Sequence, residues 1–210
     1  MPYSPTKTDG HEAHYDLLGN KVGMWVFLFT EALLFGILFI TFFVYLHEYK
    51  FDFMNASHEL NKLLGGLNTL ILLTSSLTMA LAIGAMQRDN KGLSLKLMGA
   101  TLMFGFAFLV VKAFEWGMKF EHGIYPKSEL MLTRPHGEQL FFGLYFTMTG
   151  LHAAHIIIGS VLILFAIRFV KTGKTTQKRI SFLENAGLYW HLVDVVWIYL
   201  FPMFYLIGRK

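Results

Sequence analysis

The sequence contains no cysteine. Without a thiol, the chain can form no disulfide bond and cannot hold an iron–sulfur cluster through thiolates. The same absence excludes a copper centre with cysteine ligands and a covalently attached c-type haem. These common kinds of redox centre are therefore ruled out for this chain before any motif is considered.

Charged residues are also scarce. They make up 15% of the 210 residues, whereas hydrophobic residues make up 54%. Soluble domains carry about 25% charged and about 45–50% apolar residues, so this composition indicates lipid as the solvent. The formal charge is only +4, and the basic residues lie mostly in short connections, without interleaved aromatic residues. The pattern argues against nucleic-acid binding.

Long apolar runs dominate the remainder of the chain. A helix that spans a membrane needs about 20 mostly apolar residues. The sequence predicts five such helices, near residues 22–46, 64–86, 93–118, 139–168 and 186–207. Residues 1–21 are polar, and no apolar core follows a basic start there, so we expect no cleavable signal peptide. The predicted fold is an all-α integral membrane protein, with a polar tail (1–21) and one five-helix membrane domain (22–210).

The distribution of basic residues predicts the orientation. The amino-terminal tail and the second and fourth connections share one side of the membrane and carry nine basic residues, against seven on the other side. Because cytoplasmic loops are enriched in Lys and Arg, we expect the amino terminus inside and the carboxyl terminus outside. Five basic residues crowd around the fourth connection and are candidates for contact with lipid head groups: Arg168, Lys171, Lys174, Lys178 and Arg179.

The first predicted span contains a glutamate, Glu31, about nine residues from its inner end. At about 1.5 Å per residue this places the carboxyl group roughly 14 Å deep. We expect it to be protonated or strongly hydrogen-bonded, because burial disfavours the charged form. Two interpretations stay open: a protonated group that ties two helices together, and a proton-linked or otherwise reactive group.

The fourth predicted span carries a histidine pair, His152 and His155. Their spacing of three predicts side chains on about the same face of the helix. A haem needs axial ligands from opposite sides, which two such histidines cannot supply, and a closed metal site would need further ligands. Interhelical hydrogen bonding is therefore favoured over a metal or haem site.

The fifth predicted span also carries polar groups. At about 100° per residue, Glu184, His191 and Asp194 lie on one stripe of this helix. We expect His191 and Asp194 to form a polar seam with the fourth span, and to share a polar layer with Glu31. In the third span, Lys112 and Glu115 are expected to pair locally or to extend outward to the membrane surface.

Several segments resemble subunit III of the haem–copper oxidases. YWHLVDVVWIYLFP (189–202) resembles that family's signature, and TGLHAAHIIIGS (149–160) is similar to its paired-histidine helix. FLFTEALLFGILF (27–39) resembles the helix with the family's buried, carbodiimide-reactive glutamate, which corresponds to Glu31. LNTLILLTSSLTMA (67–80) resembles the next helix. The resemblance covers nearly all of the chain after Lys21, but many family members have two further helices before these five.

The resemblance implies an accessory subunit without redox cofactors in a bacterial respiratory terminal oxidase, with cytochrome c oxidase favoured. Haem and copper are then expected in partner subunits, above all the catalytic subunit I, which this subunit stabilises while it supports proton uptake. Bound phospholipid, a place in a respiratory supercomplex and a location in the bacterial cytoplasmic membrane are compatible with it.

Other functions stay open at this point. Subunit III of a quinol oxidase and the accessory protein of nitric oxide reductase are close alternatives, because both occur in five-span form. From a different class, an ion-coupled transporter would also bury Glu, His and Asp, but the sequence has no repeated half with broken helices. A membrane-bound haem or metal enzyme meets the ligand objections given above.

Overall fold

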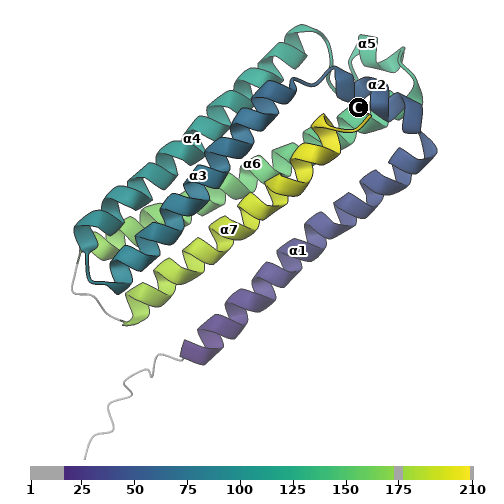
Figure 1. The fold of residues 1–210 in the computed structure, drawn as a ribbon. Helices are drawn as coiled ribbons and strands as arrows, with labels where there is room; N and C mark the ends of the chain where they lie inside the picture. Colours follow the sequence, from purple (N-terminus) through teal and green to yellow (C-terminus); the bar gives the residue numbers. More distant parts are fainter. Residues whose placement is uncertain (1–16, 173–176, 209–210) are drawn as a thin grey trace, which may run out of the picture.

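The computed structural model describes residues 17–172 and 177–208, which form seven helices (Figure 1). Their bounds are α1 Leu17–Glu48, α2 Lys50–His58, α3 Lys62–Gln87, α4 Lys91–Glu121, α5 Glu129–Leu132, α6 His136–Lys171 and α7 Gln177–Tyr205. The described residues contain no strand. The all-α prediction is therefore confirmed.

Five of these helices are long and apolar enough to cross a membrane: α1, α3, α4, α6 and α7. Each coincides with a predicted span, and the protein is a multi-pass membrane protein. Helix α7 begins at Gln177, before the predicted start of the last span at residue 186. Ile180 and Phe182 pack against the apolar core, and the Phe182 ring meets the Phe169 ring of α6 edge to face. Packing at this end therefore extends the helix into a segment that the sequence predicted as a polar connection.

The connection between the first two spans is also more ordered than predicted. It contains α2, whose Phe53 and Ala56 are fully buried. The Phe53 ring packs edge to face against Phe42 of α1 and Phe141 of α6. This aromatic contact explains why a segment of mixed polarity forms a helix at the end of the bundle.

The helices α3, α4, α6 and α7 form a four-helix bundle, and α1 lies along its edge against α6 and α7 (Figure 1). Helix α7 is the most buried span and α1 the least. Close packing at the centre depends on two glycines that face the indole of Trp190. A Cβ atom at Gly105 would lie 2.7 Å from that ring, and one at Gly159 would lie 2.9 Å from it. Any larger residue at these positions would push α4 or α6 away from α7.

The two ends of the bundle carry different connections. Helix α1 begins at one end, together with the α3–α4 connection and the start of α7, whereas α2, α5 and the end of α7 lie at the opposite end (Figure 1). Because the chain has five spans, which is an odd number, the start of α1 and the end of α7 must lie at opposite ends of the bundle. The side of the membrane that each end faces stays a prediction from the basic residues.

Candidate functional site

Glu31 of α1 meets His155 of α6. The carboxyl oxygen Oε2 of Glu31 lies 2.9 Å from Nε2 of His155, and Nδ1 of His155 lies 2.7 Å from the carbonyl oxygen of Leu151. Because a carbonyl only accepts hydrogen bonds, Nδ1 carries a proton and donates it. The contact between Nε2 and Oε2 then holds one further proton, which belongs either to the carboxyl group or to the imidazole. The pair is therefore a neutral hydrogen bond or an ion pair across a helix interface.

Aromatic rings frame this contact. The His155 ring lies 5.1 Å from the Phe35 ring of α1, edge to face, and stacks on Tyr189 of α7. His155 is buried, but the Glu31 side chain keeps 18% of its surface exposed, since α1 lies at the edge of the bundle. The pair thus fastens the most peripheral span to the bundle near the middle of α1.

His152 lies in a different interface from His155, contrary to the prediction. Its ring is fully buried between Phe108 of α4, at 5.3 Å, and Trp197 of α7, at 5.1 Å. Neither ring nitrogen has a hydrogen-bond partner within the described part of the chain. A spacing of three leaves about 60° between two side chains on a helix. On the crowded helix α6 that angle separates the α1 interface from the core of the bundle.

The polar stripe of α7 faces α3, so the predicted seam with the fourth span is wrong. Nδ1 of His191 lies 2.7 Å from the hydroxyl oxygen of Ser76, and Glu184 accepts a hydrogen bond of 3.0 Å from Gln87. Both partners belong to α3. The reason is the close packing of α7 on α3: a Cβ atom at Gly187, about one turn before His191, would lie 2.5 Å from the Ile83 side chain of α3.

Asp194 completes the stripe but is not bonded like its neighbours. It is 3% exposed, and neither carboxyl oxygen has a hydrogen-bond partner among the described residues. The Ser76 hydroxyl is one of its polar neighbours. Glu31 bonds to His155 and His191 bonds to Ser76, so these groups do not bond to one another. Their expected shared depth in the bilayer stays a prediction.

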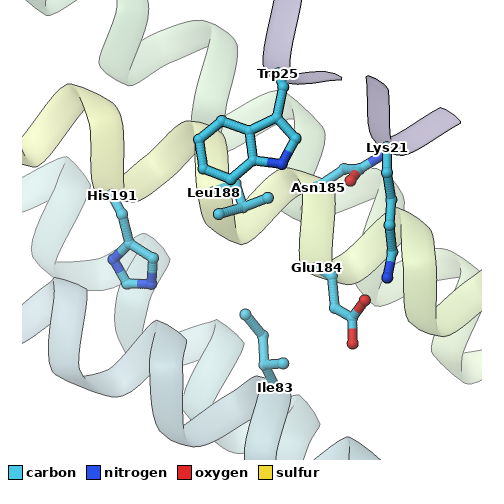
Figure 2. Close-up of a pocket in the computed structure, with 7 residues that line it drawn as sticks. All are labelled: Lys21, Trp25, Ile83, Glu184, Asn185, Leu188 and His191. Atoms are coloured by element: carbon cyan, nitrogen blue, oxygen red, sulfur yellow. The ribbon is translucent and has the colours of Figure 1, made fainter. Parts of the chain in front are cut away.

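A cavity of about 310 Å³ opens between α1, α3 and α7 at the end where α1 begins. Figure 2 shows Lys21 and Trp25 entering it from α1, and Glu184 and His191 from α7. The remaining lining residues are Ile83, Asn185 and Leu188. The cavity therefore combines groups of both charges with an indole and an imidazole at one end of the bundle.

The candidate lipid-binding residues are only partly described. Arg168 and Lys171 line a groove at the end of α6, beside apolar side chains that include Leu164 and Phe165. Lys174 lies outside the described residues, as do the side chains of Lys178 and Arg179. The groove combines cationic heads with an apolar wall, which suits the interfacial region of a bilayer.

Lys112 and Glu115 of α4 pair as predicted, but they do not extend outward. Their side chains are 2% and 1% exposed, and Nζ of Lys112 donates to Oε2 of Glu115 over 3.1 Å. Nζ also donates to the hydroxyl oxygens of Tyr145, at 3.1 Å, and Tyr205, at 2.7 Å. The Tyr205 hydroxyl in turn donates to Glu115 over 2.7 Å. All three ammonium hydrogens therefore have acceptors inside the bundle.

Sequence reasoning missed the two tyrosines of this cluster. They lie on α6 and α7, far from Lys112 along the chain, and each stands in an aromatic run such as FFGLYF. The Lys112 Nζ atom also lies over three rings, 4.7 Å from Tyr145, 5.0 Å from Trp197 and 5.3 Å from Tyr205. Such contacts stabilise a desolvated cation.

Metal binding finds no support in this geometry. Within residues 17–172 and 177–208, no group of three or more His, Asp or Glu side chains is placed to hold a metal ion. His152 and His155 of α6 face different neighbours, and His155 is already bonded through both nitrogens. His155, His191 and Glu184 thus bond to side chains of other helices, whereas His152 and Asp194 have no hydrogen-bond partner in the described residues.

Comparison with known proteins identifies relatives along nearly the whole chain. A family model described as Cytochrome c oxidase subunit III matches residues 4–209. The "Cytochrome c oxidase subunit 3" of Synechocystis sp. is 34% identical over 98% of this chain and 82% of its own length. The "Probable quinol oxidase subunit 3" of Staphylococcus saprophyticus is 32% identical over 90% of this chain and 89% of its own length.

A third relative is a longer protein. The "Heme-copper oxidase subunit I+III" of Aeropyrum pernix is 28% identical over 94% of this chain and only 24% of its own length. The family model spans nearly all 210 residues, and these relatives match along most of the chain. The chain belongs to the cytochrome c oxidase subunit III family and is a subunit III of a haem–copper oxidase complex.

Proposed function

We propose that this chain is the accessory, non-redox subunit III of a bacterial respiratory terminal oxidase in the cytoplasmic membrane. In this role it contacts the catalytic subunit I, stabilises it and supports proton uptake, while haem and copper are held by partner subunits. The polar tail 1–21 precedes a single membrane domain, 22–210, with the amino terminus inside. The observation that carries the proposal is the bonding of the buried polar groups to neighbouring helices, above all Glu31 to His155.

Contact with subunit I is supported by the relative from Aeropyrum pernix, whose name joins subunits I and III in one chain. Two proteins that occur fused generally function side by side. The exposed apolar surface of α1, which includes Trp25, Ile37 and Ile40, leaves a large area for a protein neighbour or lipid.

We propose cytochrome c as the electron donor of the complex. The second candidate is a quinol, because a relative named for quinol oxidase matches at 32% identity, close to the 34% of the cytochrome c oxidase relative. Oxygen consumption of the purified complex with reduced cytochrome c and with a quinol decides between them. Turnover with quinol alone would overturn the choice of donor but leave the role of this subunit intact.

The role as an accessory subunit is tested by purification through an affinity tag on this chain. We expect a catalytic haem-containing subunit to co-purify, with a visible spectrum that belongs to that partner. The isolated chain should show neither a haem spectrum nor stoichiometric copper or zinc in metal analysis. A tagged chain that carries one equivalent of haem by itself, or that brings down no haem protein, would contradict the proposal.

A further inference from the structure

We propose that Tyr189 of α7 is a positioning residue for the contact between Glu31 and His155. Its ring sets the plane of the His155 imidazole and so directs Nε2 to the Glu31 carboxyl group. The three residues belong to three different helices, α7, α1 and α6. The inference rests on the proposed function only for the importance of that contact, and its test needs no oxidase activity.

The orientation of the His155 ring is not fixed by its own helix. The χ2 torsion of a histidine is broad, so α6 alone leaves the ring plane variable. Nδ1 is held locally, because it donates to the carbonyl oxygen of Leu151 over 2.7 Å. Nε2, in contrast, must point across the interface to lie 2.9 Å from Oε2 of Glu31. Because a hydrogen bond weakens steeply as its angle closes, this contact needs a further restraint on the ring plane.

Tyr189 supplies that restraint. Its ring centroid lies 6.3 Å from that of His155, and the two ring planes differ by only 19°, so the rings stack. Stacked ring pairs at such separations are favourable. The Phe35 ring of α1 meets the same imidazole edge to face, at 5.1 Å and 64°. A nearly parallel ring from α7 and a steeply inclined ring from α1 together restrict the tilt of the imidazole.

The Tyr189 ring also contacts the helix that carries Glu31. Phe27 of α1 stacks on it, with the ring centroids 5.9 Å apart and 21° between the planes. Phe27 and Phe35 lie four residues before and four residues after Glu31, so all three side chains share one face of α1. Tyr189 thus touches α1 about one turn from Glu31 and touches α6 at His155, which fixes both sides of the contact.

Tyr189 has little space to move away from His155. Its side chain is only 1% exposed. Gly159 of α6 lies about one turn after His155, and a Cβ atom there would be 3.3 Å from the Tyr189 ring. The Glu31 carboxyl group is an electrostatic neighbour of the Tyr189 hydroxyl, but both stacking contacts are made by the faces of the ring. The positioning role therefore belongs to the ring.

Nitrogen NMR of the full chain in lipid nanodiscs tests this role. With 15N-labelled histidine, the Nε2 signal reports whether that nitrogen is hydrogen-bonded, and the spectrum of His155→Gln assigns it. Tyr189→Leu should shift the signal toward that of an unbonded nitrogen, because ring pairs bias a conformation by about two- to tenfold. Tyr189→Phe keeps the ring and should keep the wild-type signal. An unchanged signal in Tyr189→Leu, or an equal shift in Tyr189→Phe, would overturn the proposal.

The matched control is Tyr199→Leu. Tyr199 is another tyrosine of α7 whose ring contacts α1, with 6.0 Å between its centroid and that of Phe39. It lies ten residues after Tyr189, roughly 15 Å along the helix, so its loss loosens α1 without removing a ring from His155. The Nε2 signal should stay unchanged. A shift as large as that of Tyr189→Leu would mean that any loosening of α1 moves the imidazole, which would contradict a specific role for Tyr189.

Two further measurements apply if Tyr189→Leu does not accumulate. In the wild-type chain, carbon correlation spectra with labelled Tyr and His should show a cross-peak between the rings of Tyr189 and His155. Phe27→Leu, at a position that is 43% exposed, removes the ring that holds Tyr189 and should move the Nε2 signal in the same direction by less. Absence of the cross-peak, or no shift in Phe27→Leu, would overturn the proposal. Either result leaves co-purification with a haem protein, and hence the proposed function, to be decided separately.

Discussion

Two acid–base pairs lie inside this membrane protein, and they differ in how the surrounding helices support them. Glu31 and His155 join α1 to α6 at the edge of the bundle, where Glu31 keeps 18% of its side chain exposed. Lys112 and Glu115 lie on one helix in the core, at 2% and 1% exposure, with two tyrosine hydroxyls and three rings around the ammonium. The first pair connects two elements, whereas the second completes a closed polar cluster among three helices.

The difference follows from the position of the helices. Only 17% of the most apolar 18-residue stretch of α1 is buried, against 56% of the corresponding stretch of α7. A polar group at the edge can be solvated by lipid head groups or water when its partner is lost, but a charge in the core cannot. The cost of breaking each pair should therefore rise from the edge to the centre.

The largest effect is expected for Lys112→Met. The change leaves the Glu115 carboxylate and both tyrosine hydroxyls without the ammonium, and breaking a buried ion pair costs about 3–5 kcal/mol. We expect a strong loss of folded protein, measured by size-exclusion chromatography and by thermal denaturation in detergent. The double variant Lys112→Met with Glu115→Gln removes the unpaired charge and should recover part of the loss. If Lys112→Met alone is as stable as wild type, the Lys112–Glu115 pair is no more critical for stability than the Glu31–His155 pair.

Glu31→Ala should have an intermediate effect. It leaves Nε2 of His155 without its partner, and an unsatisfied buried polar group costs about 1–3 kcal/mol. Because the contact fastens α1, we expect faster hydrogen exchange or proteolysis in α1 and a lower yield of the oxidase complex. The matched control is Thr30→Ala, whose hydroxyl bonds only within α1, to the Phe27 carbonyl. Equal protection of α1 in both variants would mean that apolar packing alone holds the helix.

His152 and His155 of α6 should respond differently to replacement by phenylalanine. His155→Phe breaks the bond to Glu31, whereas His152→Phe replaces a ring whose nitrogens have no partner in the described residues. Exchanging an unpartnered polar ring for an apolar one of similar shape should change the free energy of unfolding by less than about 1 kcal/mol. Denaturation curves of the two variants compare them directly. A larger loss for His152→Phe would indicate that water or another subunit bonds to His152.

The smallest effect is expected for Glu31→Gln. The amide NH2 can donate to Nε2 of His155 while Nδ1 continues to donate to Leu151, so the contact survives without an ionisable group. We expect normal assembly and a nearly unchanged ratio of protons released per electron in vesicles. Electron transfer that persists while proton release disappears would show that Glu31 relays protons.

Local sequence predicted the spans well, because a long apolar run must be helical to satisfy its backbone in lipid. It did not predict α2 or the early start of α7. Both depend on distant aromatic contacts, such as Phe53 with Phe141 and Phe182 with Phe169. The candidate residues Glu31, His155 and His191 were recognised because polar groups in apolar runs are costly. Their partners were not, since His155 lies 124 residues from Glu31 and Ser76 lies 115 residues from His191.

Composition and periodicity by themselves determined that this chain crosses a membrane on five helices, binds no thiolate-ligated centre and buries a small set of ionisable groups. Only the tertiary structure decided which of those groups meet. It placed the α7 stripe against α3, separated His152 from His155, and enclosed Lys112 between two tyrosines that no local pattern distinguished from other aromatic residues. The physical reason is that a polar group in lipid needs a partner, but the requirement does not specify the helix that supplies it. Helix packing, through close contacts such as Trp190 against Gly105 and Gly159, makes that choice.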